Sequence, residues 1–190
     1  MLYEAILVAI VVGFVARGRI SNLAHMKLFK IWLVFLSFFI QIGMEYLGAR
    51  GVQLVFDYGI YLYGFSYLLL FIFLWINRHL PGNILLSLGF FLNFLVIMLN
   101  GGAMPVTLEG LDHSYVTMLK NNELPTYKIL DGSAKLPWLS DVFIIPWPKG
   151  KAFSIGDIFI SIGVFWLVFK TMINSDNYSR LISVRGMKLR

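Results

Sequence analysis

Polar side chains recur at helical spacing within the second apolar segment of this chain. Ser37, Gln41 and Glu45 are each four residues apart, so on a helix they form one stripe that ends near the end of the segment. Polar side chains inside lipid normally face other parts of the protein, because an unpaired polar group in hydrocarbon costs free energy. The stripe is therefore expected to face the interior of a helix bundle.

Two other apolar segments carry pairs of polar residues. Asn93 and Asn100 share a face of the fourth segment, and Asp157 and Ser161 share a face of the fifth. If these faces meet the stripe, they line an outward-facing cavity for a cation, a proton or a polar headgroup, closed by an aspartate from the external connection. The hypothetical ligand-binding residues are Gln41, Glu45, Asn93, Asn100, Asp141 and Asp157.

Some of these residues also have structural interpretations at helix ends. Asp157 follows Ser154 in the Ser-x-x-Asp pattern of a capping box, which satisfies free backbone amides at a helix start. Asn100-Gly101-Gly102 is typical of a helix C-terminus, and Pro105 prevents the helix from continuing. Both interpretations stay open beside the cavity hypothesis.

Glu45 and Asn93 have structural interpretations as well. Glu45 is close enough to the outer surface to be solvated or to pair with Arg50, about one turn further on. Asn93 lies near the middle of its segment, where an interhelical amide hydrogen bond would satisfy it. The sequence does not decide between these roles and ligand binding.

The chain offers few groups for catalysis. It has no Cys, and His25, His79 and His113 lack partners at metal-ligand spacing. No P-loop, dinucleotide-binding Gly motif or Gly-x-Ser-x-Gly elbow is present. We therefore assign no catalytic residue, metal or cofactor. The alternative is an intramembrane or interfacial enzyme that acts on a lipid-linked substrate through the outer-side carboxylates.

Long apolar segments must position these residues. Hydrophobic residues make up 58% of the 190-residue chain and the mean hydropathy is +0.76, whereas soluble globular chains are roughly half apolar. A helix needs about 17 to 25 residues to cross the hydrocarbon core of a bilayer. The sequence predicts an all-α membrane protein, one domain over residues 1–190 with a five-helix transmembrane bundle. The predicted spans cover residues 2–16, 28–47, 59–76, 84–99 and 155–173.

The Lys and Arg residues orient this bundle. They concentrate in the first connection, in the third and after the last span, and such short basic loops stay in the cytoplasm. The N-terminus is then outside and the C-terminus inside. The basic cytoplasmic tail, residues 174–190, should lie on anionic lipids. Although the net charge is +6, nucleic acid is not a predicted partner, because the topology accounts for the charge.

The fourth connection, residues 101–153, is longer than a helix–helix turn and too apolar for a disordered linker. We expect a partly helical external cap. Thr107 can N-cap a short helix within it. The Pro-broken run at 136–148 is too short to span and should lie at the outer interface or re-enter slightly.

Two further patterns concern the outer surface and helix packing. Tyrosines gather at the outer end of the third span, as in an interfacial aromatic belt, with ligand stacking as the alternative; they are Tyr58, Tyr61, Tyr63 and Tyr67. In the first span small residues recur every fourth position, at Ala5, Ala9 and Gly13. Such a face allows another helix to approach closely.

Four short motifs follow one another in the second half of the chain. They are Asn-Gly-Gly-Ala-Met-Pro-Val at 100–106, Leu-Ser-Asp at 139–141, Pro-Trp-Pro at 146–148 and Ser-Ile-Gly-Asp at 154–157. In this order the chain resembles a family of small bacterial integral membrane proteins catalogued as domain of unknown function 5317. The chain departs from the family pattern at Ser140, where we expect Gly. The resemblance implies a multi-pass protein of the bacterial inner membrane and implies no activity.

These residues favour a non-catalytic membrane protein, either a binding or transport component or a subunit of a membrane complex. Five spans of modest length enclose little volume for a carrier, so transport would require a homodimer or another membrane protein as partner. The lipid bilayer is the first expected partner of such a chain.

Overall fold

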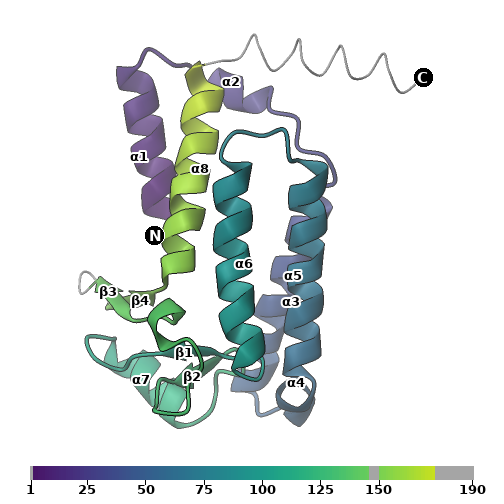
Figure 1. The fold of residues 1–190 in the computed structure, drawn as a ribbon, viewed down its shortest axis with the longest axis vertical. Helices are drawn as coiled ribbons and strands as arrows, with labels where there is room; N and C mark the ends of the chain where they lie inside the picture. Colours follow the sequence, from purple (N-terminus) through teal and green to yellow (C-terminus); the bar gives the residue numbers. More distant parts are fainter. Residues whose placement is uncertain (1, 146–149, 174–190) are drawn as a thin grey trace.

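The computed structural model describes residues 2–145 and 150–173, and five apolar helices dominate its fold (Figure 1). Two of them coincide with predicted spans and the others differ from the prediction at their ends. The five are α1 (Leu2–Val15), α3 (Trp32–Ala49), α5 (Gly59–Ile76), α6 (Asn83–Leu99) and α8 (Ile155–Ile173).

Three of these helices, α3, α5 and α8, are long and apolar enough to cross a membrane. α1 and α6 are apolar but shorter. Large apolar side chains stand on the surface of the bundle, and Phe39 on α3 is 74% exposed and Ile84 on α6 is 83% exposed. Soluble proteins rarely expose such continuous apolar surface. The fold is therefore that of a membrane protein.

The helices pack as neighbours in the order α1, α8, α6, α5 and α3. Glycines allow the closest approaches. A side chain at Gly13 of α1 would meet Met172, and a side chain at Gly163 of α8 would meet Leu86 of α6. Ala9 and Gly13 are the buried residues of α1, so the small-residue face predicted from the sequence is the face that packs against α8.

Consecutive apolar helices alternate in direction (Figure 1). The start of α1 lies toward the same end of the molecule as the segment between α6 and α8, and the loops that join α1 to α3 and α5 to α6 lie at the opposite end. The predicted second span begins at residue 28, but α3 begins at Trp32 because the side chain of Asn77 holds the preceding turn. Asn77 Oδ1 accepts from the backbone N–H of Phe29 (2.9 Å), and Asn77 Nδ2 donates to its carbonyl (2.8 Å).

The cap between α6 and α8 contains strands, which corrects the all-α prediction. β1 (Met104–Val106) and β2 (Tyr127–Ile129) pair in parallel, and β3 (Phe143–Ile145) and β4 (Lys151–Phe153) form an antiparallel pair. Strands of three residues are too short to show alternation, so the sequence did not reveal them. The remaining short elements are α2 (Ser21–Ala24), α4 (Gln53–Asp57), α7 (His113–Lys120) and a 3-10 turn (Pro137–Leu139).

The cap also corrects two local predictions. Asp112, rather than Thr107, caps α7, because its carboxylate accepts from the backbone N–H of Ser114. The Pro-broken run at 136–148 forms a 3-10 turn and then β3 as far as it is described. The Pro-Trp-Pro motif and the basic tail fall at 146–149 and 174–190, outside the described residues.

Candidate functional site

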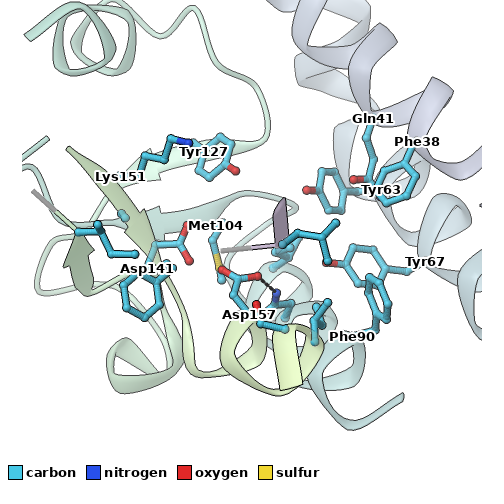
Figure 2. Close-up of a pocket in the computed structure, with 18 residues that line it drawn as sticks. Phe38, Gln41, Tyr63, Tyr67, Phe90, Met104, Tyr127, Asp141, Lys151 and Asp157 are labelled. Carbon is cyan, nitrogen blue, oxygen red and sulfur yellow. Dashed lines mark hydrogen bonds between the residues drawn. The ribbon is translucent and has the colours of Figure 1, made fainter. Parts of the chain in front are cut away.

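A cavity of about 330 Å³ lies where the helices meet the cap (Figure 2). α3, α5, α6 and α8 contribute to its walls, together with the four strands β1 to β4 and the first residue of α1. Four of the six residues predicted to bind a ligand line this cavity, namely Gln41, Asn93, Asp141 and Asp157. Glu45 and Asn100 are not among its lining residues.

Asn100 ends α6, as the helix C-terminus interpretation of its motif predicted. Its side-chain amide donates to the carbonyls of Val96 (2.9 Å) and Lys135 (2.8 Å), and its oxygen accepts from the backbone N–H of Lys135 (2.9 Å). Gly102 follows with φ of +92° and touches the backbone of Ile60, so a side chain there would be strained and would collide. Asn100 joins the cap to α6 and is excluded from the cavity.

Glu45 lies at the junction of α3 with the cap, outside the cavity. Its carboxylate accepts a hydrogen bond from the backbone of Thr126, while Oε1 is buried with no hydrogen-bond partner in the part of the chain that the structure describes. The predicted pairing with Arg50 is not seen, because that guanidinium lies over the ring of Tyr46, 4.6 Å from its centroid.

Asn93, Ser154 and Asp157 form a closed hydrogen-bonded ring between α6 and the start of α8. The backbone N–H of Ser154 donates to Asp157 Oδ2 (3.0 Å), and that of Asp157 donates to Ser154 Oγ (3.0 Å), which is the predicted capping box. Asn93 Nδ2 donates to Asp157 Oδ1 (2.9 Å), and Ser154 Oγ donates to Asn93 Oδ1 (2.8 Å). The ring therefore combines the capping and interhelical interpretations, and it holds Asp157 at one wall of the cavity.

The Ser-Ile-Gly-Asp motif explains this geometry residue by residue. Ser154 and Asp157 supply the capping box, and Gly156 leaves room for the side chain of Asn93, which a Cβ at this position would overlap. Gly156 also packs on the backbone of Gly89. The motif thus brings α8 against α6 and orients one carboxylate.

Asp141 is the second carboxylate and is held by its backbone. Its N–H donates to the carbonyl of Pro105 (3.0 Å), and its carbonyl accepts from Thr107 (3.1 Å), so the Met-Pro-Val strand that ends the first motif positions it. The residue is 6% exposed, and its Oδ1 is buried with no hydrogen-bond partner among residues 2–145 and 150–173. Burial, with a smaller contribution from the negative charge of Asp157, raises the pKa of Asp141 to about 8.

Aromatic rings form much of the remaining wall. Tyr63 and Tyr67, one turn apart on α5, stack with centroids 5.5 Å apart, and Phe90 meets Tyr67 edge-on at 6.4 Å. Gln41 donates to Ser66 Oγ (3.0 Å) between α3 and α5. In Figure 2 the labelled residues Tyr63, Tyr67 and Gln41 lie across the space from Asp141 and Asp157.

The tyrosines of α5 therefore divide into two groups. Tyr58 and Tyr61 are 57% and 73% exposed, as an interfacial belt requires, whereas Tyr63 and Tyr67 are buried and line the cavity. Their spacing of four residues is a signal that the sequence contains. The contributions of Tyr127 and Lys151 to the wall could not be found in this way, because both depend on how the cap folds over the bundle.

The site combines two carboxylates with neutral amides and aromatic rings. Among the described residues, no group of three or more His, Cys, Asp or Glu side chains is placed to hold a metal ion. This arrangement suits binding of a small polar or charged group beside an apolar one. Among the described residues, no donor reaches Asp141 Oδ1, so a ligand with a donor or a positive charge could satisfy this atom.

Comparison with known proteins places the chain among relatives without an assigned activity. The family described as "Family of unknown function (DUF5317)" matches residues 25–169, which include all six predicted site residues. A protein of Thermotoga maritima, described as an uncharacterized protein, is 31% identical over 115 residues, which cover 53% of this chain and 58% of that protein. No solved structure matches the chain.

Proposed function

We propose a function for this chain from the premise that it belongs to the DUF5317 family of unknown function. It is a multi-pass protein of the bacterial cytoplasmic membrane, and it binds a small ligand beneath an external cap. It acts as a binding component and not as a catalyst. The observation that carries this proposal is the buried Oδ1 of Asp141, which has no hydrogen-bond partner in the described part of the chain and lies at the wall of a cavity of about 330 Å³.

The alternating directions of the apolar helices support five membrane crossings (Figure 1). α1 and α6, with 14 and 17 residues, are short for a full crossing. Flanking residues that snorkel or a locally thin bilayer accommodate such lengths. The cap and the start of α1 then lie outside, and the basic loops lie in the cytoplasm.

The cost of keeping Asp141 in its position supports a ligand-binding role. A buried carboxylate oxygen without a donor costs free energy, and at Asp141 a ligand in the cavity could recover that cost. Asp157 makes the contrast clear, since both of its oxygens accept hydrogen bonds that organise α8. Asp141 has no comparable side-chain role in the fold, and a ligand that donates a hydrogen bond or carries positive charge would satisfy it.

A bulky substitution that fills the cavity should abolish ligand binding, which tests this function. Ser161 lines the cavity on α8, whereas its neighbour Ile162 is 46% exposed on the outer surface. Thermal unfolding in lipid nanodiscs would be followed with three solutes of similar shape, the cation choline, the neutral 3,3-dimethylbutan-1-ol and the anion 3,3-dimethylbutanoate. We expect at least one of them to raise the unfolding temperature of the wild type and of Ile162→Phe, but not that of Ser161→Phe. No shift with any solute, or a shift that survives in Ser161→Phe, would contradict the proposal.

One observation favours a second function, an interfacial enzyme that acts on a lipid-linked substrate. The pKa of Asp141 is raised to about 8 by burial beside Asp157, as expected of a carboxylic acid that donates a proton near neutral pH. Incubation of the protein in liposomes of bacterial lipid extract, followed by mass spectrometry of the lipids, would test this function. A product formed by the wild type and lost in Asp141→Asn would favour the enzyme over the binding protein.

A further inference from the structure

We infer that the cavity beneath the cap binds a small organic ammonium group, with Asp141 as its main anionic partner and the rings of Tyr63 and Tyr67 as its aromatic wall. This inference rests on the proposed binding function and names the chemistry of its ligand. It follows from the charge, the lining and the size of the cavity.

Charge selects against anions. The acidic groups that line the cavity are Asp141 and Asp157, and the negative charge of Asp157 already acts on Asp141. Lys151 also contributes to the lining, but it is an exposed residue of β4, so solvent screens its charge. A bound anion would meet the negative charge of Asp157 and would make ionisation of Asp141 still less favourable. A cation would provide Asp141 Oδ1 with the partner that it lacks.

The aromatic lining favours an organic cation over a metal ion. Tyr63, Tyr67 and Phe90 line the cavity from the helices, and Tyr127 lines it from the cap. The faces of such rings attract alkylammonium groups, and aromatic cages are a recurrent site for them. Calcium needs six to eight oxygen ligands and magnesium a near-octahedral shell. The described residues do not bring three carboxylate or histidine side chains together for either ion.

Size limits the ligand to a small molecule or headgroup. A cavity of about 330 Å³ is near the lower end of ligand pockets. Two ligands that carry an ammonium group fit this size. One is a free solute of the outer compartment, and the other is the ethanolamine headgroup of a membrane lipid. Both place a positively charged nitrogen between the carboxylates and the rings.

Choline and 3,3-dimethylbutan-1-ol test the charge directly, because they have the same shape and only choline carries the positive nitrogen. In nanodiscs of phosphatidylglycerol alone we expect choline to bind with a dissociation constant about tenfold or more below that of the neutral alcohol, as cation–π and carboxylate contacts together predict. Equal affinity of the two solutes would overturn the inference, and so would tighter binding of 3,3-dimethylbutanoate. A larger shift with calcium or magnesium chloride than with choline would overturn it as well.

Variants identify the groups that recognise the charge. We expect Asp141→Asn to weaken choline binding about tenfold or more, since one partner of a buried charge pair is lost, and to leave binding of the alcohol unchanged. Asp131→Asn is the matched control, because Asp131 is an exposed carboxylate of the cap outside the cavity lining. Tyr67→Phe should retain choline binding and Tyr67→Leu should lose it, provided that both variants unfold cooperatively without ligand. Unchanged choline binding in Asp141→Asn would overturn the assignment.

The two proposals fail in different ways. If the neutral or anionic solute binds at least as tightly as choline and Ser161→Phe abolishes that binding, the cavity is a ligand site but the ammonium inference is wrong. If none of the three solutes binds, the proposed function fails together with the inference. If choline binds and Ser161→Phe abolishes binding, both are supported.

Nanodiscs with added phosphatidylethanolamine distinguish the two sources. A lipid headgroup in the site would raise the unfolding temperature of the wild type but not that of Asp141→Asn, and would weaken the effect of added choline. A free solute as ligand would leave the choline effect the same in both lipids. Either result supports an ammonium site, whereas no effect of choline and none of phosphatidylethanolamine overturns it.

Discussion

At the scale of single residues, the two aspartates of the cavity differ in how they are satisfied. Both oxygens of Asp157 accept N–H donors at the start of α8, where the helix dipole also favours a negative charge. Asp141 is held by its backbone, and no described residue provides a hydrogen-bond partner for its Oδ1. Removing the charge should therefore destabilise the fold at Asp157 and stabilise it at Asp141.

The stability of Asp141→Asn relative to the wild type should rise with pH. The pKa of Asp141 is about 8 in the folded protein and about 3.9 in an unfolded chain. Between these values unfolding releases a proton, so the free energy of unfolding of the wild type falls by up to about 1.4 kcal/mol per pH unit, and it levels off above pH 8. The amide of the variant does not titrate, so the free energy of unfolding of the variant rises relative to that of the wild type between pH 5 and pH 8. The facing groups Asp157, Lys151 and Tyr127 are present in both proteins and largely cancel in the difference.

Thermal unfolding in detergent between pH 5 and pH 9 measures this effect. Asp131→Asn is again the control, because hydrogen bonds from Ser133 lower the pKa of the exposed Asp131 carboxyl. Removal of this carboxyl should give no increase in stability relative to the wild type toward pH 8. A loss of stability in Asp141→Asn across the whole range would instead show that this carboxylate has a structural role.

Choline affinity should also depend on pH, and it should rise over the pH range in which the stability of the wild type falls. A cation prefers the ionised carboxylate, and below pH 8 its binding to the wild type must displace the Asp141 proton. We expect the dissociation constant of choline to fall by up to about tenfold per pH unit from pH 6 to pH 8 and then to level off. Isothermal titration at each pH measures it. A constant affinity over this range would show that Asp141 does not contact the ligand.

At the scale of elements, the contact between α6 and α8 determines where the site forms. Gly89 and Gly156 let the two backbones approach, and Asn93 on α6 completes the cap of α8. This interface is both the main support of α8 and one wall of the cavity. Changes that separate the two helices should therefore reduce stability and binding together.

Gly156→Ala tests this contact. The added methyl group would overlap Asn93 Oδ1 and lie 2.8 Å from the carbonyl oxygen of Gly89, so we expect a loss of about 1–3 kcal/mol in the free energy of unfolding. Gly43→Ala is the matched control on α3, since no atom lies within 4 Å of its added Cβ and alanine favours a helix by up to about 1 kcal/mol. Chemical unfolding in mixed micelles measures both. Equal stability of the two variants would mean that α6 and α8 do not depend on close approach.

At the scale of the whole molecule, charge and hydropathy orient the bundle. In the topology that we propose, the cap lies outside and the loops with Arg17, Lys30 and Arg78 lie inside, because short basic loops stay in the cytoplasm. The cavity beneath the cap is then reached from the outer face. This orientation decides which compartment supplies a soluble ligand.

Labelling of single cysteines tests the orientation, because the chain has no Cys of its own. Ser133 in the cap and Ser21 in α2 are both exposed and lie at opposite ends of the molecule. We expect a membrane-impermeant maleimide to label Ser133→Cys in intact cells and Ser21→Cys only after permeabilisation. The reverse pattern would invert the proposed topology.

The apolar helices and much of the capping chemistry could be predicted from the sequence alone. Length and hydropathy are local properties, so the bounds of α5 and α8 agree with the predicted spans. The Ser154–Asp157 capping box and the end of α6 at Asn100 are also local, because their residues are close in sequence. The resemblance of the motifs to one family was confirmed by the match over residues 25–169.

Only the tertiary structure decided which polar residues meet. Helix rotation and the path of the cap place Gln41, Asn93, Asp141 and Asp157 around one cavity and leave Glu45 and Asn100 outside it. Asp141 is 36 residues from Pro105, yet it is held beside that residue by one backbone hydrogen bond. Contacts between residues far apart in sequence depend on the packing of every element between them, and a hydropathy pattern carries no record of that packing.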